Sequence, residues 1–224
     1  MTFGQTREVD WAILNVLSDD DRREFVRSCR RRRFGRNEVI FHEGDPGDTL
    51  HLIDRGHVAV RVTTPLGDVA TLRVLAPGEF FGELAVVSPA PRNATAIAMD
   101  GVETLSVHHD RFEELRLTHP RVDRVLVEAL STEVRRLAVH LVDALYVPVE
   151  RRVWRRLTEL ARAFSADGTE AVVPLTQEDL AQVVGTTRPT VNRLLREGES
   201  AGFLRVTRGR VEILDTETLA RRAR

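Results

Sequence analysis

The segment FFGELAVVSPAPRNA, residues 80–94, places one acid and one base among small and apolar residues. The two charged residues are Glu83 and Arg92. One interpretation is a partly buried ion pair, an ordinary feature of globular domains. The other is a site for an anion that also carries a hydroxyl group, such as a ribose-phosphate. Arginine neutralises a phosphate, and a carboxylate accepts a hydrogen bond from a hydroxyl.

A second group of polar residues lies in LTQEDLAQVVGTTRPTVNRLLREGESAGFL, residues 175–204. Arginine can donate two hydrogen bonds to guanine, and asparagine can pair in the same way with adenine. Such side chains on an outer helix face suit the major groove of DNA. The alternative is a three-helix packing unit with solvated arginines. The polar set comprises Arg188, Thr190, Asn192, Arg193 and Arg196.

The histidines raise a third possibility, a cupin-like metal enzyme, because a β-barrel can hold a metal with several histidines and an acid. They are scattered or adjacent rather than paired at ligand spacing, so we expect no metal and no enzymatic activity. The single cysteine, Cys29, excludes an internal disulfide and a cysteine-ligated cluster. The histidines considered are His42, His51, His57, His108 and His109.

The composition is that of a globular protein, with 42% hydrophobic and 30% charged residues in 224, enough for two domains. No apolar run approaches the roughly 20 residues of a membrane helix, and the N-terminus lacks a secretory signal. We therefore expect a cytoplasmic protein without a membrane partner. Residues 150–224 hold 14 arginines against 11 acids, whereas residues 1–149 hold 19 against 23, which favours a polyanion partner for the C-terminal third.

The elements that must position Glu83 and Arg92 lie in the N-terminal half. A helical pattern covers the first 35 residues, with Ser18 as a cap and Arg30–Arg33 as a solvated helix end. From residue 37 to about residue 108, short β-branched runs alternate with glycine turns, which predicts an antiparallel β-sandwich or barrel. Helices dominate the remainder, so the predicted class is α+β.

One long helix is predicted over Arg121–Tyr146, because this segment lacks glycine and proline. Its apolar residues recur at alternating spacings of three and four. This heptad seam favours a parallel coiled-coil homodimer over packing on the helix's own domain. Pro148 indicates a hinge at residues 147–150. The seam consists of Val127, Leu130, Val134, Leu137, Leu141 and Ala144.

Residues 175–204 predict two helices joined by a glycine turn. Thr176 and Asp179 form a capping box for the first helix, and Gly185 permits the turn. Thr187 caps the second helix, and Pro189 lies in its first turn, where the missing N–H costs little. The apolar residues expected to face inward are Leu180, Val183, Val184, Val191, Leu194 and Leu195.

A hairpin, FLRVTRGRVEIL, follows these helices. Its tip carries Arg208, Gly209 and Arg210, which suit contact with DNA phosphates as a wing. The cap, the glycine turn, the inner face and the basic tip together predict a winged helix-turn-helix.

With these features in view, the chain resembles the cyclic-AMP receptor protein and fumarate-nitrate regulator (Crp/Fnr) family of bacterial transcription factors. Three landmarks carry the resemblance: HEGDPGDTLHLIDRGHVAV, FGELAVVSPAPRNA and LTQEDLAQVVGTTRPTVNRLL. It implies an effector-sensing antiparallel β-jelly roll with flanking helices over residues 1–118, a dimerisation helix over 119–146, a hinge at 147–150 and a winged helix-turn-helix over 151–224. It also implies a homodimer that binds double-stranded DNA at a near-palindromic operator and contacts RNA polymerase.

In that family the second landmark holds a cyclic nucleotide, which implies cAMP or cGMP as the effector. By position, Gly82 and Glu83 take the ribose and phosphate edge, and Arg92 pairs with the phosphate. Asn93 adds a hydrogen bond, and Leu84 forms a wall of the pocket.

Two departures from the cyclic-AMP-responsive members leave the effector open. Asn93 stands where those members have serine or threonine. Leu137 and Ala138 stand on the long helix where those members meet the purine with polar residues. A same-family regulator with another effector, or with none, is therefore the alternative to cyclic-nucleotide gating.

The DNA-binding unit also departs from the family, which commonly uses an Arg-Glu pair and a second arginine. Here Arg188, Pro189 and Arg193 occupy these positions. Because the proline side chain cannot accept a hydrogen bond from cytosine, the DNA half-site should differ from the family's best-known half-site at the base pair that the glutamate contacts. The predicted DNA-binding residues are Thr176, Gln177, Thr187, Arg188, Pro189, Thr190, Asn192, Arg193, Arg208 and Arg210.

Overall fold

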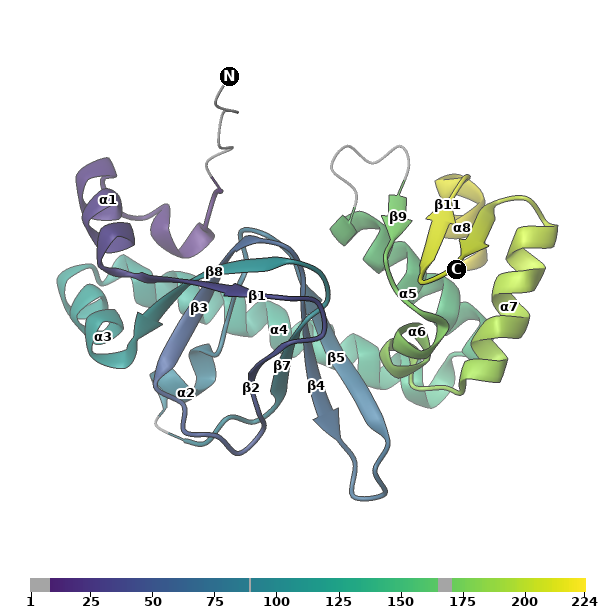
Figure 1. Cartoon of the computed structure of the whole chain (residues 1–224), viewed down its shortest axis with the longest axis horizontal. Helices are drawn as coiled ribbons and strands as arrows, with labels where there is room; N and C mark the ends of the chain where they lie inside the picture. The colour runs from purple at the N-terminus through teal and green to yellow at the C-terminus, as the bar shows by residue number, and fades with distance from the viewer. Residues whose placement is uncertain (1–8, 89, 165–170) are drawn as a thin grey trace. The chain divides into compact units, whose positions relative to one another are not determined.

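The computed structural model describes residues 9–88, 90–164 and 171–224 (Figure 1). The chain divides into two compact units. The first contains residues 1–60 and 75–132, and the second contains residues 61–74 and 133–224.

Antiparallel strands form two sheets, as the alternation of β-branched runs and glycine turns predicted, and they build the jelly roll that the resemblance implied. Two four-stranded sheets have the strand orders β1-β8-β3-β6 and β2-β7-β4-β5. The non-consecutive neighbours are typical of a double-sheet roll. The strands are β1 (Arg30–Phe34), β2 (Val39–Phe41), β3 (Thr49–Arg55), β4 (Val58–Thr63), β5 (Val69–Leu75), β6 (Phe80–Phe81), β7 (Thr95–Ala98) and β8 (Val102–His108).

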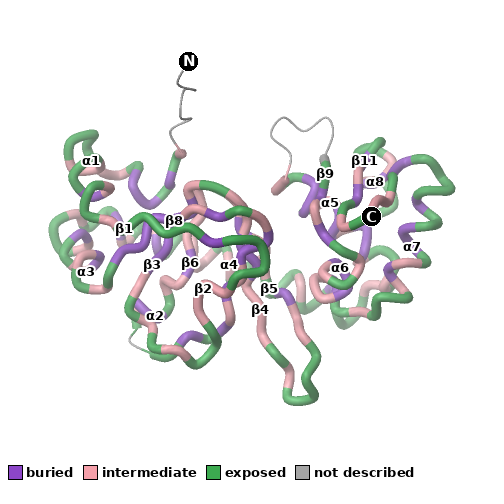
Figure 2. The backbone as a smooth tube through the Cα atoms, viewed as in Figure 1, coloured by how far each residue is buried: buried purple, intermediate pink, exposed green. Residues whose placement is uncertain are grey.

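Short helices lie against one face of the sheet that contains β3 and β8, and their apolar side chains form a core with those of the sheet. The buried residues of these elements are purple in Figure 2. Trp11 belongs to this core, and its indole Nε1 donates to the carbonyl of Ile53 at 2.9 Å. Ser18 caps α1 as expected, because its side chain accepts from the Asp21 amide. The helices are η1 (Ala12–Leu14), α1 (Asp19–Ser28), α2 (Glu83–Val87) and α3 (His109–Thr118).

The prediction that Arg30–Arg33 ends a helix is wrong, because these residues form strand β1, which pairs with β8. Cross-strand contacts explain the difference. Arg31 forms ion pairs with Glu103 on the adjacent strand β8 and with Asp54 on β3, the next strand of the same sheet. Opposite charges on adjacent strands stabilise a strand that four exposed arginines would otherwise disfavour.

The long helix α4 (Arg121–Tyr146) begins and ends where the sequence predicted. Three residues of the predicted seam are well exposed, with Val127 at 61%, Val134 at 66% and Leu141 at 61% of their full accessible surface. An apolar stripe this exposed suits a helix that packs against a partner. Helix α5 (Val149–Phe164) follows closely, so the break in the helical backbone comprises residues 147 and 148.

The second unit contains the predicted winged helix-turn-helix. Its three-stranded sheet has the order β10-β11-β9, and Trp154 of α5 meets Phe203 edge to face at 5.4 Å. Of the described helices, none is both long and apolar enough to cross a membrane. The remaining elements are β9 (Ala171–Val173), α6 (Gln177–Val184), α7 (Arg188–Ser200), β10 (Leu204–Thr207), β11 (Arg210–Ile213) and α8 (Thr216–Arg222).

Candidate effector site and DNA interface

Gly82 connects strand β6 to helix α2 and brings the backbone close to Arg92. Its φ of +83° lies in the left-handed region, which glycine adopts without strain. A Cβ atom at this position would lie 2.6 Å from Arg92 Nη1 and 2.9 Å from the Thr49 carbonyl oxygen. Only glycine therefore allows this approach without displacing its neighbours.

Arg92 is buried, with 4% of its surface exposed, and uncharged oxygens accept its hydrogen bonds. Nη1 donates to the Gly82 carbonyl at 2.9 Å, and Nη2 donates to the carbonyl and the hydroxyl of Thr49 at 2.7 and 2.9 Å. The guanidinium stacks on Phe41 with its carbon 4.1 Å from the ring centre. Its Nε has no hydrogen-bond partner among the described residues.

The electrostatics of Arg92 follow from this burial. Loss of water lowers the pKa of the guanidinium, while the negative charges of Asp48, Glu83 and Asp45 act in the opposite direction. An arginine remains protonated in proteins under such conditions. The segment of residues 80–94, which we call the cassette, therefore holds a buried positive charge with an N–H that has no hydrogen-bond partner in the described part of the chain. This combination favours an anionic ligand.

His51 continues the polar contacts of Arg92 into the roll. Its ring stacks on Phe81 at 5.0 Å, and its nitrogens lie 3.4 Å from the Thr49 hydroxyl and 3.2 Å from the Thr104 hydroxyl. Burial is the main cause that lowers the pKa of His51 to about 3, and the positive charge of Arg92 is the second. The imidazole is therefore neutral near pH 7 and adds no charge to the site.

The structure brings only some of the predicted effector residues together. Gly82 and Arg92 are in contact, whereas Asn93 is exposed and Leu84 is 45% exposed. Leu137 and Ala138 lie exposed on α4, in the part of that helix that belongs to the second unit. Their assignment to a purine site stays a prediction.

The two helices of the DNA-binding unit are positioned by the local signals in the sequence. Thr176 and Asp179 form the reciprocal capping box at the start of α6, and Gly185 ends α6 with a φ of +69°. Thr187 precedes α7, although its hydroxyl contacts the Thr190 hydroxyl at 3.0 Å instead of capping the backbone. The apolar residues predicted to face inward on α7 are buried, namely Val191, Leu194 and Leu195.

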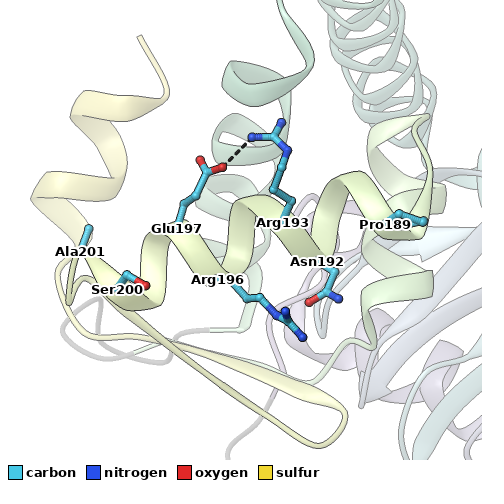
Figure 3. Close-up of a pocket in the computed structure, with 7 residues that line it drawn as sticks. All are labelled: Pro189, Asn192, Arg193, Arg196, Glu197, Ser200 and Ala201. Carbon is cyan, nitrogen blue, oxygen red and sulfur yellow. Dashed lines mark hydrogen bonds and ion pairs between the residues drawn. The ribbon is translucent and has the colours of Figure 1, made fainter.

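The outer side of α7 borders an open hollow of about 720 Å³, which we call the reading face (Figure 3). Arg193 Nη1 donates to Glu197 Oε1 at 2.6 Å, and its Nη2 donates to Glu150 Oε1 at 3.4 Å. Asn192 accepts from the Gln177 amide of α6 at 3.4 Å. The lining residues are Pro189, Asn192, Arg193, Arg196, Glu197, Ser200 and Ala201.

A second groove, of about 440 Å³, lies between the starts of the two helices and the wing. It brings together Thr176 and Gln177 of α6, Arg188 of α7, and Arg208 and Arg210 at the wing. These residues come from three elements and were predicted to contact phosphates or bases. The convergence of hydroxyl, amide and guanidinium donors on one groove suits a phosphate backbone.

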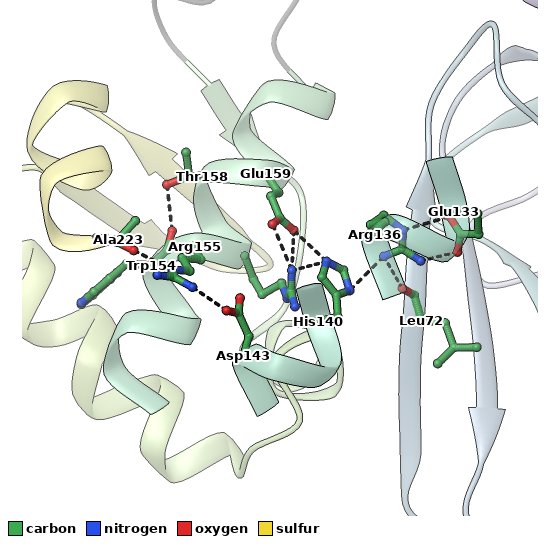
Figure 4. Close-up of polar contacts among 11 residues, drawn as sticks. Leu72, Glu133, Arg136, His140, Asp143, Trp154, Arg155, Thr158, Glu159 and Ala223 are labelled. Atoms are coloured by element: carbon green, nitrogen blue, oxygen red, sulfur yellow. Dashed lines mark hydrogen bonds and ion pairs between the residues drawn. The ribbon is translucent and has the colours of Figure 1, made fainter. Parts of the chain in front are cut away.

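A polar network in the second unit was not predicted from the sequence (Figure 4). Arg136 of α4 donates to Glu133 and to the Leu72 carbonyl at 3.0 Å. His140 lies between Arg136 and Arg156, with one ring nitrogen against each guanidinium. Because an imidazole ring accepts a hydrogen bond at no more than one nitrogen, at least one of these two contacts is not a hydrogen bond.

The same region contains a contact between the β4–β5 hairpin and the first helix of the DNA-binding unit. Arg61 Nη2 donates to Asp179 Oδ1 at 2.8 Å, and Asp179 is also the capping-box acid of α6. No short-range spacing reveals this pair, because 118 positions separate the two residues.

Within the described residues, no group of three or more histidines, cysteines or acids could hold a metal ion. The histidines have other contacts. His57 pairs with Asp100 at 2.8 Å, and His109 Nδ1 lies 3.1 Å from the Val86 carbonyl oxygen. These contacts provide no support for a cupin-like metal site.

Comparison with known proteins identifies relatives for both halves of the chain. Residues 31–119 match the family model described as "Cyclic nucleotide-binding domain", and residues 151–222 match the "Crp-like helix-turn-helix domain". A CRP-like cAMP-activated global transcriptional regulator of Mycobacterium tuberculosis is 34% identical over 194 residues, which cover 85% of this chain and 87% of the relative. The cyclic AMP receptor protein of Thermus thermophilus is 30% identical over 190 residues, covering 85% and 86%.

The fold has close neighbours among solved structures. A CRP-family transcriptional regulator from Thermus thermophilus superposes with a TM-score of 0.72 at 25% identity, and the match covers 86% of this chain and 96% of the neighbour.

Proposed function

The chain belongs to the Crp/Fnr family of bacterial transcription regulators, and we propose that it acts as a homodimer on a near-palindromic DNA operator in the cytoplasm. The observation that carries this proposal is the pair of surfaces on the helix-turn-helix. The reading face presents Asn192 and Arg193 for base edges, and the adjacent groove gathers donors for phosphates.

The individual roles follow from position. Arg188, Asn192 and Arg193 contact bases from the first two turns of α7. Pro189 stands where the family has a glutamate, so no carboxylate accepts a hydrogen bond from cytosine at that base pair. Thr187 and Thr190 lie at the start of the same helix, where their hydroxyls suit phosphate oxygens. Thr176, Gln177, Arg208 and Arg210 hold the backbone from the second groove.

Dimerisation would use the exposed stripe of α4. The seam residues Val127, Val134 and Leu141 are each more than half exposed in the single chain. A parallel pair of α4 helices would bury them in a knobs-into-holes seam. Two reading helices related by a two-fold axis then match half-sites about one helical turn apart. Contact with RNA polymerase is part of the proposal through the family alone.

The cassette fits a cyclic nucleotide as effector. Arg92 is buried, charged and has a spare Nε–H, and Gly82 lets the backbone approach the same point. A phosphate would accept the hydrogen bonds that Arg92 now donates to Gly82 and Thr49, and Glu83 would accept a hydrogen bond from a ribose hydroxyl. Binding would shift the population of DNA-competent dimers by the difference in its affinity for the two states.

A regulator of the same family with another effector, or with none, is the second candidate. Leu137 and Ala138 offer no hydrogen bond to a purine, and their exposure on α4 suits a ligand-independent dimer seam.

Two measurements test these proposals. Full-length protein at physiological salt should bind a sequence selected from a random pool far more tightly than random duplex, and equal affinities would refute DNA-specific regulation. Calorimetry with cAMP and with cGMP should give heat and a change in affinity for the selected site. If neither nucleotide binds, the second candidate replaces the first, while the DNA-binding proposal stands.

A further inference from the structure

Glu197 lies on the reading face although it was not among the predicted DNA-binding residues. It follows Arg193 by one helical turn, and its Oε1 accepts from Arg193 Nη1 at 2.6 Å (Figure 3). Glu150, at the start of α5, accepts from Nη2 at 3.4 Å, close to the limit for a hydrogen bond. Arg193 is thus firmly bonded at one nitrogen and weakly bonded at the other.

The stability of α7 does not account for an acid at position 197. Glu197 lies near the C-terminal end of α7, where the helix dipole disfavours a negative charge. An arginine followed by a glutamate four residues later is also the less favourable order for a helical ion pair. The pair is about half exposed on both sides, so it contributes little to folding.

General affinity for DNA does not account for Glu197 either. A carboxylate that lines the same hollow as Asn192 and Arg196, on a surface that approaches phosphates, weakens binding to any duplex. Its effect on Arg193 is more specific. Because Glu197 engages Nη1, the Nε–Nη2 edge of the guanidinium is left to turn toward a base once the long bond to Glu150 is exchanged.

We propose that Glu197 is a positioning residue that determines specificity: it holds Arg193 so that one guanidinium edge meets guanine, and its charge lowers affinity for DNA that lacks guanine at that step. The proposal rests on the DNA-binding function above. An arginine with a fixed plane discriminates between bases, whereas a free arginine can move to the nearest phosphate.

The test is site selection from a random duplex pool with full-length wild type, Glu197→Gln and Arg193→Ala, followed by affinity measurements on selected and random duplexes. For Glu197→Gln we expect the guanine preference at one step of each half-site to fall toward that of Arg193→Ala. The ratio of selected to random affinity should drop about tenfold, and affinity for random duplex should rise about threefold, because a repulsive charge is lost.

Two further variants separate positioning from charge. Glu217→Gln removes one exposed acid from α8 and should leave the base preference unchanged. In the Arg193→Ala background, Glu197→Gln should cause no further loss of guanine preference. Unchanged selection by Glu197→Gln, or an additive loss in the double variant, overturns the inference while DNA binding stands. If wild type selects no sequence, both the proposed function and this inference fail.

Discussion

Arg92 and Arg193 are the same side chain in opposite surroundings. Arg92 is 4% exposed and bonded to carbonyl and hydroxyl oxygens, whereas the side chain of Arg193 is 52% exposed and bonded to two carboxylates. The buried arginine keeps a charge that its hydrogen-bond partners do not neutralise. Two acids neutralise the exposed arginine. DNA can displace such an acid, or the acid can orient the guanidinium.

The difference shows how one residue type serves two kinds of recognition. Burial fixes Arg92 in a single geometry and makes a small anion the natural complement of its charge. Exposure lets Arg193 exchange partners quickly, so its selectivity depends on the acid that holds it. Variants that change the surroundings of one of these arginines and leave those of the other intact test this contrast.

The largest effect should come from Gly82→Ala, which crowds the buried arginine. The new Cβ would meet Arg92 Nη1 at 2.6 Å in a backbone with positive φ, and we expect a loss of about 3 kcal/mol in unfolding free energy. Gly67→Ala is the matched control, because Gly67 has a φ of +90° and open space around it, and it should cost about 1 kcal/mol. Equal losses in urea unfolding would show that Arg92 can move aside.

Arg193→Ala should give the next effect, on DNA alone. We expect the affinity for the selected operator to fall by about 10- to 100-fold, since a bidentate contact to guanine is lost. Affinity for random duplex should fall much less. Fluorescence anisotropy on both duplexes measures the ratio, and a parallel loss on both would mean that Arg193 contacts phosphate only.

The neutral state of His51 predicts that the free energy of unfolding of the protein depends on pH. Its folded pKa of about 3 lies below the ordinary value of 6.5, so the unfolded chain binds more protons between these values. The free energy of unfolding should therefore fall as pH drops from 6.5 toward 3, by at most about 1.4 kcal/mol per pH unit from this group.

His51→Gln should make that pH dependence shallower, because it removes the group whose pKa differs between the folded and unfolded states. Urea unfolding at several pH values between about 6.5 and about 4 compares the slopes. Identical slopes for His51→Gln and wild type would contradict the assignment of a buried neutral imidazole.

The smallest effect should come from Glu150→Gln. Its contact with Arg193 is long and both side chains are more than half exposed, so we expect a change in operator affinity of less than about twofold. An effect as large as that of Glu197→Gln would mean that Glu150 positions Arg193 as much as Glu197 does.

The sequence allowed prediction of the elements that short spacings define. The helix at Arg121–Tyr146, the Thr176–Asp179 capping box and the antiparallel strands between residues 37 and 108 were all predicted from residues close together in the chain. Strand β1 was missed because its stability depends on Asp54 and Glu103 in other strands.

The candidate sites were predictable to different degrees for the same reason. Arg92 could be singled out as a charged residue in an apolar segment, but its partner Thr49 lies 43 positions away and carries no local signal. Glu197 is a different case, because its spacing of four from Arg193 is visible in the sequence. What the spacing does not tell is whether that pair faces solvent or a ligand.

The central claim is that the reading face recognises a DNA sequence. Its most direct test compares the affinity of full-length protein for its selected sequence and for random duplex of equal length at physiological salt. We predict a preference of at least about a thousandfold. Equal affinities for the two duplexes would contradict the claim.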